Sequence, residues 1–161
     1  MEMFNAKTLE YIGNYLKNKK ETIAVAESVT SGALQLALSS VFEASFFYQG
    51  GLTAYNLGQK FKHLSVEPIH AEAVNCVSEK VADDMATGVS ILFGSDWGIG
   101  ITGYASPVPE SGNKIFAYYS FGYKNKIRDS GRIDLPQADP IDIQLTYTNK
   151  IVEKLAVLLK Q

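Results

Sequence analysis

Residues 22–32 read TIAVAESVTSG, and this segment decides the fold class. Thr22–Ala26 is a short apolar run rich in β-branched residues, which is typical of a buried strand. Glu27–Gly32 follows at once, and a helical pattern begins at Ala33. Strand, tight turn and helix start together predict a βα unit, the building block of sheets with parallel strands.

Outward from this unit, helical and extended patterns alternate along the chain. The predicted elements are a helix at 6–20, a strand at 22–26, a helix at 33–40, a strand at 46–54, a helix at 56–64, a helix after Ser78, a strand at 97–102, a hairpin of strands 115–123 and 126–135, and a closing helix after Asp139. Residues 104–113, rich in Pro and Gly, are predicted to be a loop. This order favours a single α/β domain, residues 1–161, built as a three-layer α/β/α sandwich with a mixed, mainly parallel sheet.

The composition argues against several classes of function. Fifteen basic residues stand against seventeen acidic ones, without the basic face that nucleic-acid binding requires. The single cysteine, Cys76, cannot form an internal disulfide, and the two histidines, His63 and His70, give no zinc spacing, so neither a metal nor a cofactor is expected. No apolar run approaches the roughly twenty residues of a membrane span, and residues 1–20 lack the apolar core of a secretory signal. We therefore expect a cytoplasmic protein with no nucleic-acid partner and no membrane partner.

Ser28 is the first candidate for chemistry, because it stands between a strand and a helix start. Backbone N–H groups at such a start, here those of Val29, Thr30 and Ser31, favour negative charge and can stabilise an oxyanion. Acyl transfer from an amide needs such donors, and it needs a base that accepts the serine proton. By itself, a serine in this position is far more often a helix cap than a nucleophile.

A lysine is the better candidate for the base. His63 and His70 lie on polar connecting sequence without an aspartate partner in an obvious pattern, so a Ser/His/Asp triad has weak support. A lysine can replace histidine if burial or nearby positive charge lowers its pKa, and a tyrosine can share the proton route. Tyr55 and Lys60 bracket the junction after the second strand. In two parallel βα units both junctions lie at the same edge of the sheet, so Ser28 and Lys60 can meet there.

Four sequence blocks, in the same order, resemble one known family. TIAVAESVTSG (22–32) resembles a strand followed by AESCTGG, and GGLTAYNLGQKFKHLSV (50–66) resembles GxxTYSNEAKxxxLGV. NCVSEKVADDMATGV (75–89) resembles GAVSExVAxxMAxGA, and DWGIGITGYASP (96–107) resembles D(I/V)xIxxTGIAGP. These are blocks of the CinA C-terminal domain family, which includes nicotinamide mononucleotide deamidases. The resemblance covers nearly the whole chain.

The resemblance implies roles for individual residues. Ser28 would be the nucleophile, with Tyr55 and Lys60 as its activating partners, and Glu27 would be a structural or pocket neighbour. For Thr102, a hydrogen bond that secures the strand end is as good an alternative as a ligand contact. A small-molecule amide or nucleotide substrate is implied, and the family and the aromatic surplus together suggest a homo-oligomer. The substrate-binding candidates are Glu27, Val29, Thr30, Ser31, Gly32, Thr102 and Gly103.

The chain also departs from the family. The cysteine after the serine is Val29 here, and the first glycine of the motif is Ser31. A glycine-rich loop is replaced by the shorter 108–113, and an arginine-bearing turn before the last helix is replaced by 137–142, which carries carboxylates. Arginines suited to a phosphate are therefore missing. This predicts weaker nucleotide binding or a different amide substrate.

Three functions follow as hypotheses. The first is hydrolysis of a carboxamide through a Ser/Tyr/Lys centre, with nicotinamide mononucleotide as the first substrate to try and nicotinate mononucleotide and ammonia as products. The second is a catalytically degenerate module that uses its aromatic hairpin for assembly or partner binding. The third is a binding protein for a neutral small molecule. Hydrogen-bond reach between Ser28 and Lys60, beside an open pocket, would favour the first over the second.

Overall fold

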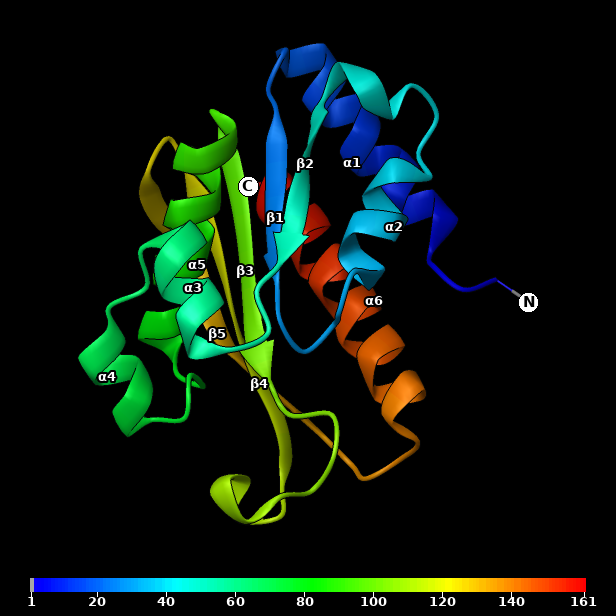
Figure 1. The fold of residues 1–161 in the computed structure, drawn as a ribbon. Helices are drawn as coiled ribbons and strands as arrows, with labels where there is room; N and C mark the ends of the chain where they lie inside the picture. The colour runs from blue at the N-terminus through cyan, green and yellow to red at the C-terminus, as the bar shows by residue number, and fades with distance from the viewer. Residues whose placement is uncertain (1) are drawn as a thin grey trace.

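The computed structural model describes residues 2–161, and Figure 1 shows how their helices and strands are arranged. In chain order the elements are α1 (Ala6–Lys19), β1 (Ile23–Glu27), α2 (Ala33–Ser39), β2 (Tyr48–Thr53), α3 (Leu57–Leu64), α4 (Pro68–Ala73), α5 (Glu79–Phe93), β3 (Trp97–Gly103), β4 (Ile115–Tyr123), β5 (Lys126–Leu135) and α6 (Pro140–Leu159). Short 3-10 turns at Ala44–Phe46 and Pro109–Ser111 lie in the connections.

The strands form one mixed sheet in the order β2-β1-β3-β4-β5. β1 pairs in parallel with both β2 and β3, while the β3–β4 and β4–β5 pairs are antiparallel. In Figure 1, α1, α2 and α6 cover one face of the sheet, and α3 and α5 lie on the other. The predicted three-layer α/β/α sandwich, with a sheet that is parallel at its centre, is confirmed.

The element boundaries reflect local signals in the sequence. Asn56 and Ser78 accept hydrogen bonds at the starts of α3 and α5, and Asp139 does the same for α6, as side chains of this kind do at helix N-termini. The hairpin turn falls at Lys124 and Asn125, which both have positive φ, as a two-residue turn of the type that matches strand twist requires. The sequence did not predict α4, which is only six residues long.

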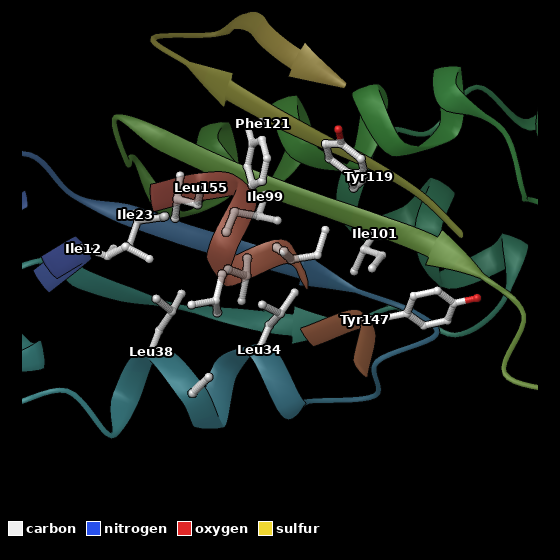
Figure 2. Packing of buried hydrophobic residues seen from close by; sticks show 14 of the residues in the cluster. Ile12, Ile23, Leu34, Leu38, Ile99, Ile101, Tyr119, Phe121, Tyr147 and Leu155 are labelled. Carbon is white, nitrogen blue, oxygen red and sulfur yellow. The ribbon is translucent and has the colours of Figure 1, made fainter. Parts of the chain in front are cut away.

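The core lies on both faces of the sheet. On β1, Ile23 and Val25 point to one side and belong to the larger cluster, which Figure 2 shows between the sheet and the helices around it. Ala24 and Ala26 point to the other side and pack in the smaller cluster beneath α3 and α5. All five residues of β1 are buried, because helices cover both faces of the sheet there. This explains why residues 23–26 are all apolar, with Glu27 as the one charged residue at the strand end.

Close packing of α5 on the sheet depends on a glycine in β3. A Cβ atom built on Gly100 would lie 2.3 Å from the carbonyl oxygen of Ala82 and 2.7 Å from the backbone nitrogen of Ala86. Both atoms belong to the backbone of α5, which cannot yield as a flexible side chain does. The absence of a side chain at Gly100 therefore sets the distance between this helix and the sheet.

The parallel pairing brings three strand ends to one edge of the sheet. Glu27, the last residue of β1, is in register with Thr53 of β2 and with Ile101 of β3. The chain segments that leave these strands therefore begin side by side, as is usual for ligand sites of open α/β sheets. Within residues 2–161, no helix combines the length and the apolar character that crossing a membrane would need.

Candidate active site

Ser28 and Lys60 are in direct contact at this edge. Lys60 Nζ lies 2.9 Å from Ser28 Oγ, although the two residues are 32 positions apart in the chain. Both are buried: the exposed fraction is 6% for Ser28 and 1% for Lys60. The structure thus brings together the serine and the lysine that the sequence predicted would meet.

The position of Lys60 follows from the start of α3. Asn56 ends the connection from β2 and accepts a hydrogen bond from the backbone N–H of Gln59, so the helix begins immediately after it. Lys60 is one turn further on and points toward the sheet, where its Nζ donates a second hydrogen bond of 2.9 Å to the carbonyl oxygen of Ala54. A carbonyl can only accept, so this contact uses one of the N–H bonds of the amine in either protonation state.

Burial makes the amine of Lys60 easier to deprotonate. Removal from water lowers its pKa below the ordinary value of 10.5, and negative charge on the neighbouring Cys76 thiol would act in the opposite direction. A neutral lysine has one lone pair, and with Ala54 fixing one N–H bond, that lone pair can accept the Ser28 hydroxyl proton. The pair therefore has the geometry and the environment of a nucleophile and its base.

The turn that carries Ser28 is held by its own backbone. Ser28 donates its N–H to the carbonyl oxygen of Ile101 in β3, and Ser31 donates its N–H to the carbonyl oxygen of Ser28. Ser31 is therefore not a free donor, in contrast to the expectation from sequence. In the part of the chain that the structure describes, the backbone N–H groups of Val29 and Thr30 have no acceptor. Both remain candidates for an oxyanion site, and of the two only Val29 lines the cavity described below.

Glu27 organises this turn from below. Its fully buried carboxylate accepts hydrogen bonds from Thr30 Oγ1 at 2.6 Å, from the backbone N–H of Leu34 at 2.8 Å and from the backbone N–H of Gln35 at 2.9 Å. Two of these donors belong to the first turn of α2, which no residue caps in the usual way. Glu27 therefore satisfies the helix start and fixes the loop of Ser28, and it has no place in the cavity wall.

An open cavity of about 470 Å³ adjoins the Ser28–Lys60 pair. Its volume is in the range of small-molecule sites. Of the substrate-binding candidates, Val29, Thr102 and Gly103 line it, whereas Thr30, Ser31 and Gly32 do not. The full lining comprises Ser28, Val29, Tyr55, Asn56, Leu57, Lys60, Ala71, Glu72, Asn75, Cys76, Val77, Thr102, Gly103, Tyr104, Ala105, Ser106, Val108 and Gln144.

Tyr55 lies in the wall of this cavity, but its side chain is 72% exposed. Within residues 2–161, its hydroxyl group forms no hydrogen bond, and neither Ser28 nor Lys60 is its partner. The structure places the three predicted catalytic residues around one cavity, and it joins two of them directly. The part of Tyr55 in the proton route stays a prediction.

Thr102 and Gly103 secure the end of β3. Thr102 Oγ1 donates a hydrogen bond of 2.7 Å to the carbonyl oxygen of Cys76, which ties the strand end to the segment before α5. A Cβ atom on Gly103 would lie 2.5 Å from that of Ala117 in β4, so this position admits only glycine at the present strand spacing. Of the two alternatives for Thr102, the structural hydrogen bond is present.

Several lining residues were missed by the sequence analysis. Gln144 comes from α6, and its Nε2 donates a hydrogen bond of 2.9 Å to the carbonyl oxygen of Val29. Asn75 Nδ2 donates a hydrogen bond of 3.1 Å to the hydroxyl oxygen of Tyr104, and both residues line the cavity. Cys76 lines the cavity as well, and burial raises the pKa of its thiol. The residues of each hydrogen-bonded pair lie far apart in the chain, so no local sequence pattern could have predicted these contacts.

The histidines take no part in the site. His63 contacts Gln59 and His70 contacts Ser78, in both cases through Nε2, and neither imidazole lines the cavity. A Ser/His/Asp triad is therefore absent from the described chain. Among residues 2–161, no group of three or more histidine, cysteine or acidic side chains is arranged to hold a metal ion.

Comparison with known proteins finds one matching family model and several curated relatives. The family model described as the CinA C-terminal domain matches residues 5–157. A CinA-like protein of Picosynechococcus is 43% identical over 103 residues, which cover 64% of this chain and 25% of that protein. A putative competence-damage inducible protein of Moorella thermoacetica is 35% identical over 144 residues, covering 88% and 35%. The chain thus spans about a quarter to a third of the length of these curated relatives.

Solved structures share the whole fold. A protein of the competence-damaged protein (CinA) superfamily from Klebsiella pneumoniae superposes with a TM-score of 0.91 at 23% identity, covering 99% of both chains. A protein of the same superfamily from Escherichia coli gives a TM-score of 0.88 at 26% identity, covering 96% of this chain and 89% of the other.

Proposed function

Because this chain belongs to the CinA C-terminal domain family, we propose that it is a serine-dependent amide hydrolase whose reaction centre is Ser28 with Lys60. Hydrolysis of a pyridine carboxamide is the proposed reaction, and nicotinamide mononucleotide is the first substrate that the family resemblance suggests. The observation that carries the proposal is the buried contact of 2.9 Å between Ser28 Oγ and Lys60 Nζ beside an open cavity.

The reaction would begin with neutral Lys60. Its lone pair takes the hydroxyl proton of Ser28 while Ser28 Oγ forms a bond to the carboxamide carbon. The carbonyl oxygen becomes an oxyanion, for which the unpaired N–H groups of Val29 and Thr30 are the candidate donors. As the tetrahedral intermediate collapses, the C–N bond breaks, and Lys60 returns its proton to the departing nitrogen. Ammonia leaves, and an ester on Ser28 remains.

The second half would repeat these steps with water. Lys60, neutral again, takes a proton from a water molecule whose oxygen bonds to the ester carbon. The bond to Ser28 Oγ then breaks, and Lys60 returns the proton to Ser28 Oγ. The product leaves as a carboxylic acid, which releases the second water proton to solvent and becomes the carboxylate. No oxidant, metal or further reactant is needed to balance these steps. Tyr55, in the cavity wall, is the proposed third member of the centre.

The test is ammonia release from nicotinamide mononucleotide by the purified chain. Ser28→Ala and Lys60→Ala are each expected to lose about 10³-fold or more in kcat, since removing a nucleophile or its base disables the whole unit. Lys62→Ala is the matched control, because Lys62 lies on the same helix with an exposed side chain. Circular dichroism spectra and unfolding midpoints establish that the variants fold.

Two results would contradict the proposal. Turnover that persists in Ser28→Ala would exclude Ser28 as the nucleophile. If wild-type protein hydrolyses none of the carboxamides tested, the non-catalytic module is favoured instead. Phe116 and Tyr118 on β4 are only half buried and support assembly through the aromatic hairpin in that case.

We also propose that the protein acts in the cytoplasm as a homo-oligomer. Sedimentation of the purified protein can test the oligomeric state.

A further inference from the structure

The charges of the cavity wall bear on which carboxamide it accepts. Among the described residues that line the cavity, the charged side chains are Lys60 and Glu72. Lys60 is buried, and both of its contacts, to Ser28 and to Ala54, are within the protein. Glu72 is exposed in the last turn of α4. As far as the structure describes the chain, the wall that a substrate meets therefore carries a carboxylate and no free cation.

This wall is poorly suited to a phosphate. Phosphate groups in protein sites are held by charge-assisted hydrogen bonds, most often from arginine or lysine, and a neighbouring carboxylate repels them. The start of α3 would favour an anion, although the backbone N–H of Gln59 there already donates to Asn56 Oδ1. Among the described residues, the N–H groups of Leu57 and Gly58 remain at this start, and they are neutral donors. Within residues 2–161, Lys60 is the only cation of the wall, and as the proposed base it must be neutral to act.

The same wall is suited to a ring that carries positive charge and to sugar hydroxyl groups. A pyridinium ring is cationic, and the exposed carboxylate of Glu72 and the aromatic faces of Tyr55 and Tyr104 attract cations. Neutral polar groups that can exchange hydrogen bonds with hydroxyls lie around them, among them Asn75 and Ser106.

We propose that the cavity selects a phosphate-free pyridinium carboxamide, a nucleoside such as nicotinamide riboside, over the corresponding nucleotide, and that Glu72 contributes to this selectivity. The proposal rests on the proposed function and narrows its substrate. Because Glu72 is exposed and water screens its charge, its share is small, and most of the discrimination comes from the lack of a cation for the phosphate.

The experiment compares three carboxamides with one purified protein. Ammonia release is measured with nicotinamide riboside, nicotinamide mononucleotide and uncharged nicotinamide, each over a range of concentrations. We expect kcat/KM for the riboside to exceed that for the mononucleotide by about tenfold or more, because the cavity offers the phosphate no cation to offset the loss of its contacts with water. Equal or better use of the mononucleotide would overturn the proposal.

The variant Glu72→Gln tests the residue. It is expected to raise KM for the riboside by about two- to fivefold with kcat unchanged, which is the size of effect that an exposed charge has. KM for uncharged nicotinamide should not change. Glu153→Gln is the control, since Glu153 is exposed on α6 and does not line this cavity. An unchanged riboside KM in Glu72→Gln would exclude this role for Glu72.

Binding separates the substrate preference from the chemistry. Calorimetric titration of Ser28→Ala protein with the riboside and the mononucleotide measures affinity without hydrolysis. If wild-type protein turns over neither compound but Ser28→Ala binds the riboside more tightly, the preference stands and the hydrolase proposal fails. If the riboside is neither bound nor hydrolysed, the substrate proposal is overturned.

Discussion

The carboxylate of Glu27 accepts a hydrogen bond from the backbone N–H of Gln35 at 2.9 Å, and this contact joins the last residue of β1 to the first turn of α2. Ser28 lies on the turn between them. A nucleophile whose loop is fixed from within the core needs little reorganisation when a substrate arrives. The stability of this turn and the activity of the site are therefore expected to depend on the same buried carboxylate.

Glu27→Gln is the first prediction. The amide can accept hydrogen bonds through one oxygen only, so one of the three donors now on Glu27 loses its partner inside the protein. We expect the free energy of unfolding to fall by about 1–3 kcal/mol, the cost of an unsatisfied buried donor, together with kcat. Urea unfolding and ammonia release measure the two effects. Glu67→Gln is the control: it removes a similar charge from the start of α4, where Glu67 is only partly buried, and should cost less.

The pH dependence of activity gives the second prediction. Burial lowers the pKa of Lys60, and only its neutral form can take the Ser28 proton. We expect kcat/KM to rise with pH and to level off below 10.5, the ordinary lysine value. A profile that still rises with full slope at 10.5 would show that Lys60 is not the base.

The pH dependence of stability tests the same shift without substrate. A lysine whose pKa is lower in the folded protein binds fewer protons there than in the unfolded chain. Stability therefore increases as the pH rises through the interval between the folded value and 10.5, and it is lowest below that interval. In Lys60→Met this increase should be absent. Chemical unfolding of both proteins across the alkaline range measures it, and parallel curves would count against the shift.

Tyr55 provides the fourth prediction. Its hydroxyl is exposed and is bonded to neither Ser28 nor Lys60, so it can join the proton route only once a substrate occupies the cavity. We expect Tyr55→Phe to lower kcat by less than about tenfold, against about 10³-fold for Lys60→Ala. Tyr55→Ala, which also removes the ring from the cavity wall, should raise KM in addition. A loss in Tyr55→Phe as large as that in Lys60→Ala would make the hydroxyl essential.

The packing of α5 on the sheet provides the fifth prediction. In Gly100→Ala the new methyl group would overlap backbone atoms of Ala82 and Ala86, so the helix must move. We expect a loss of about 1–3 kcal/mol in unfolding free energy, as overpacking of a core typically costs. Gly122→Ala in β4 is the matched control, because its nearest neighbour would lie at 3.7 Å. Similar stability of the two variants would contradict this account of the packing.

Much of the fold was predictable because its signals are local. The βα unit at 22–33, the side-chain caps at Asn56, Ser78 and Asp139, and the hairpin turn each depend on residues within a few positions of one another. The meeting of Ser28 with Lys60 was also predictable, since two parallel βα units place both junctions at one edge. The short helix α4 and the use of the Ser31 N–H within the turn were not predicted.

The sequence by itself therefore determined the layers of the fold, the family and the meeting of Ser28 with Lys60, the proposed nucleophile and base. Only the tertiary structure decided how deeply Lys60 is buried, that Glu27 supports the turn, and which charges face the cavity. The physical reason is distance along the chain. Burial of Lys60 on α3 and contacts such as that between Gln144 and Val29, which are 115 positions apart, arise only when the helices pack around the sheet.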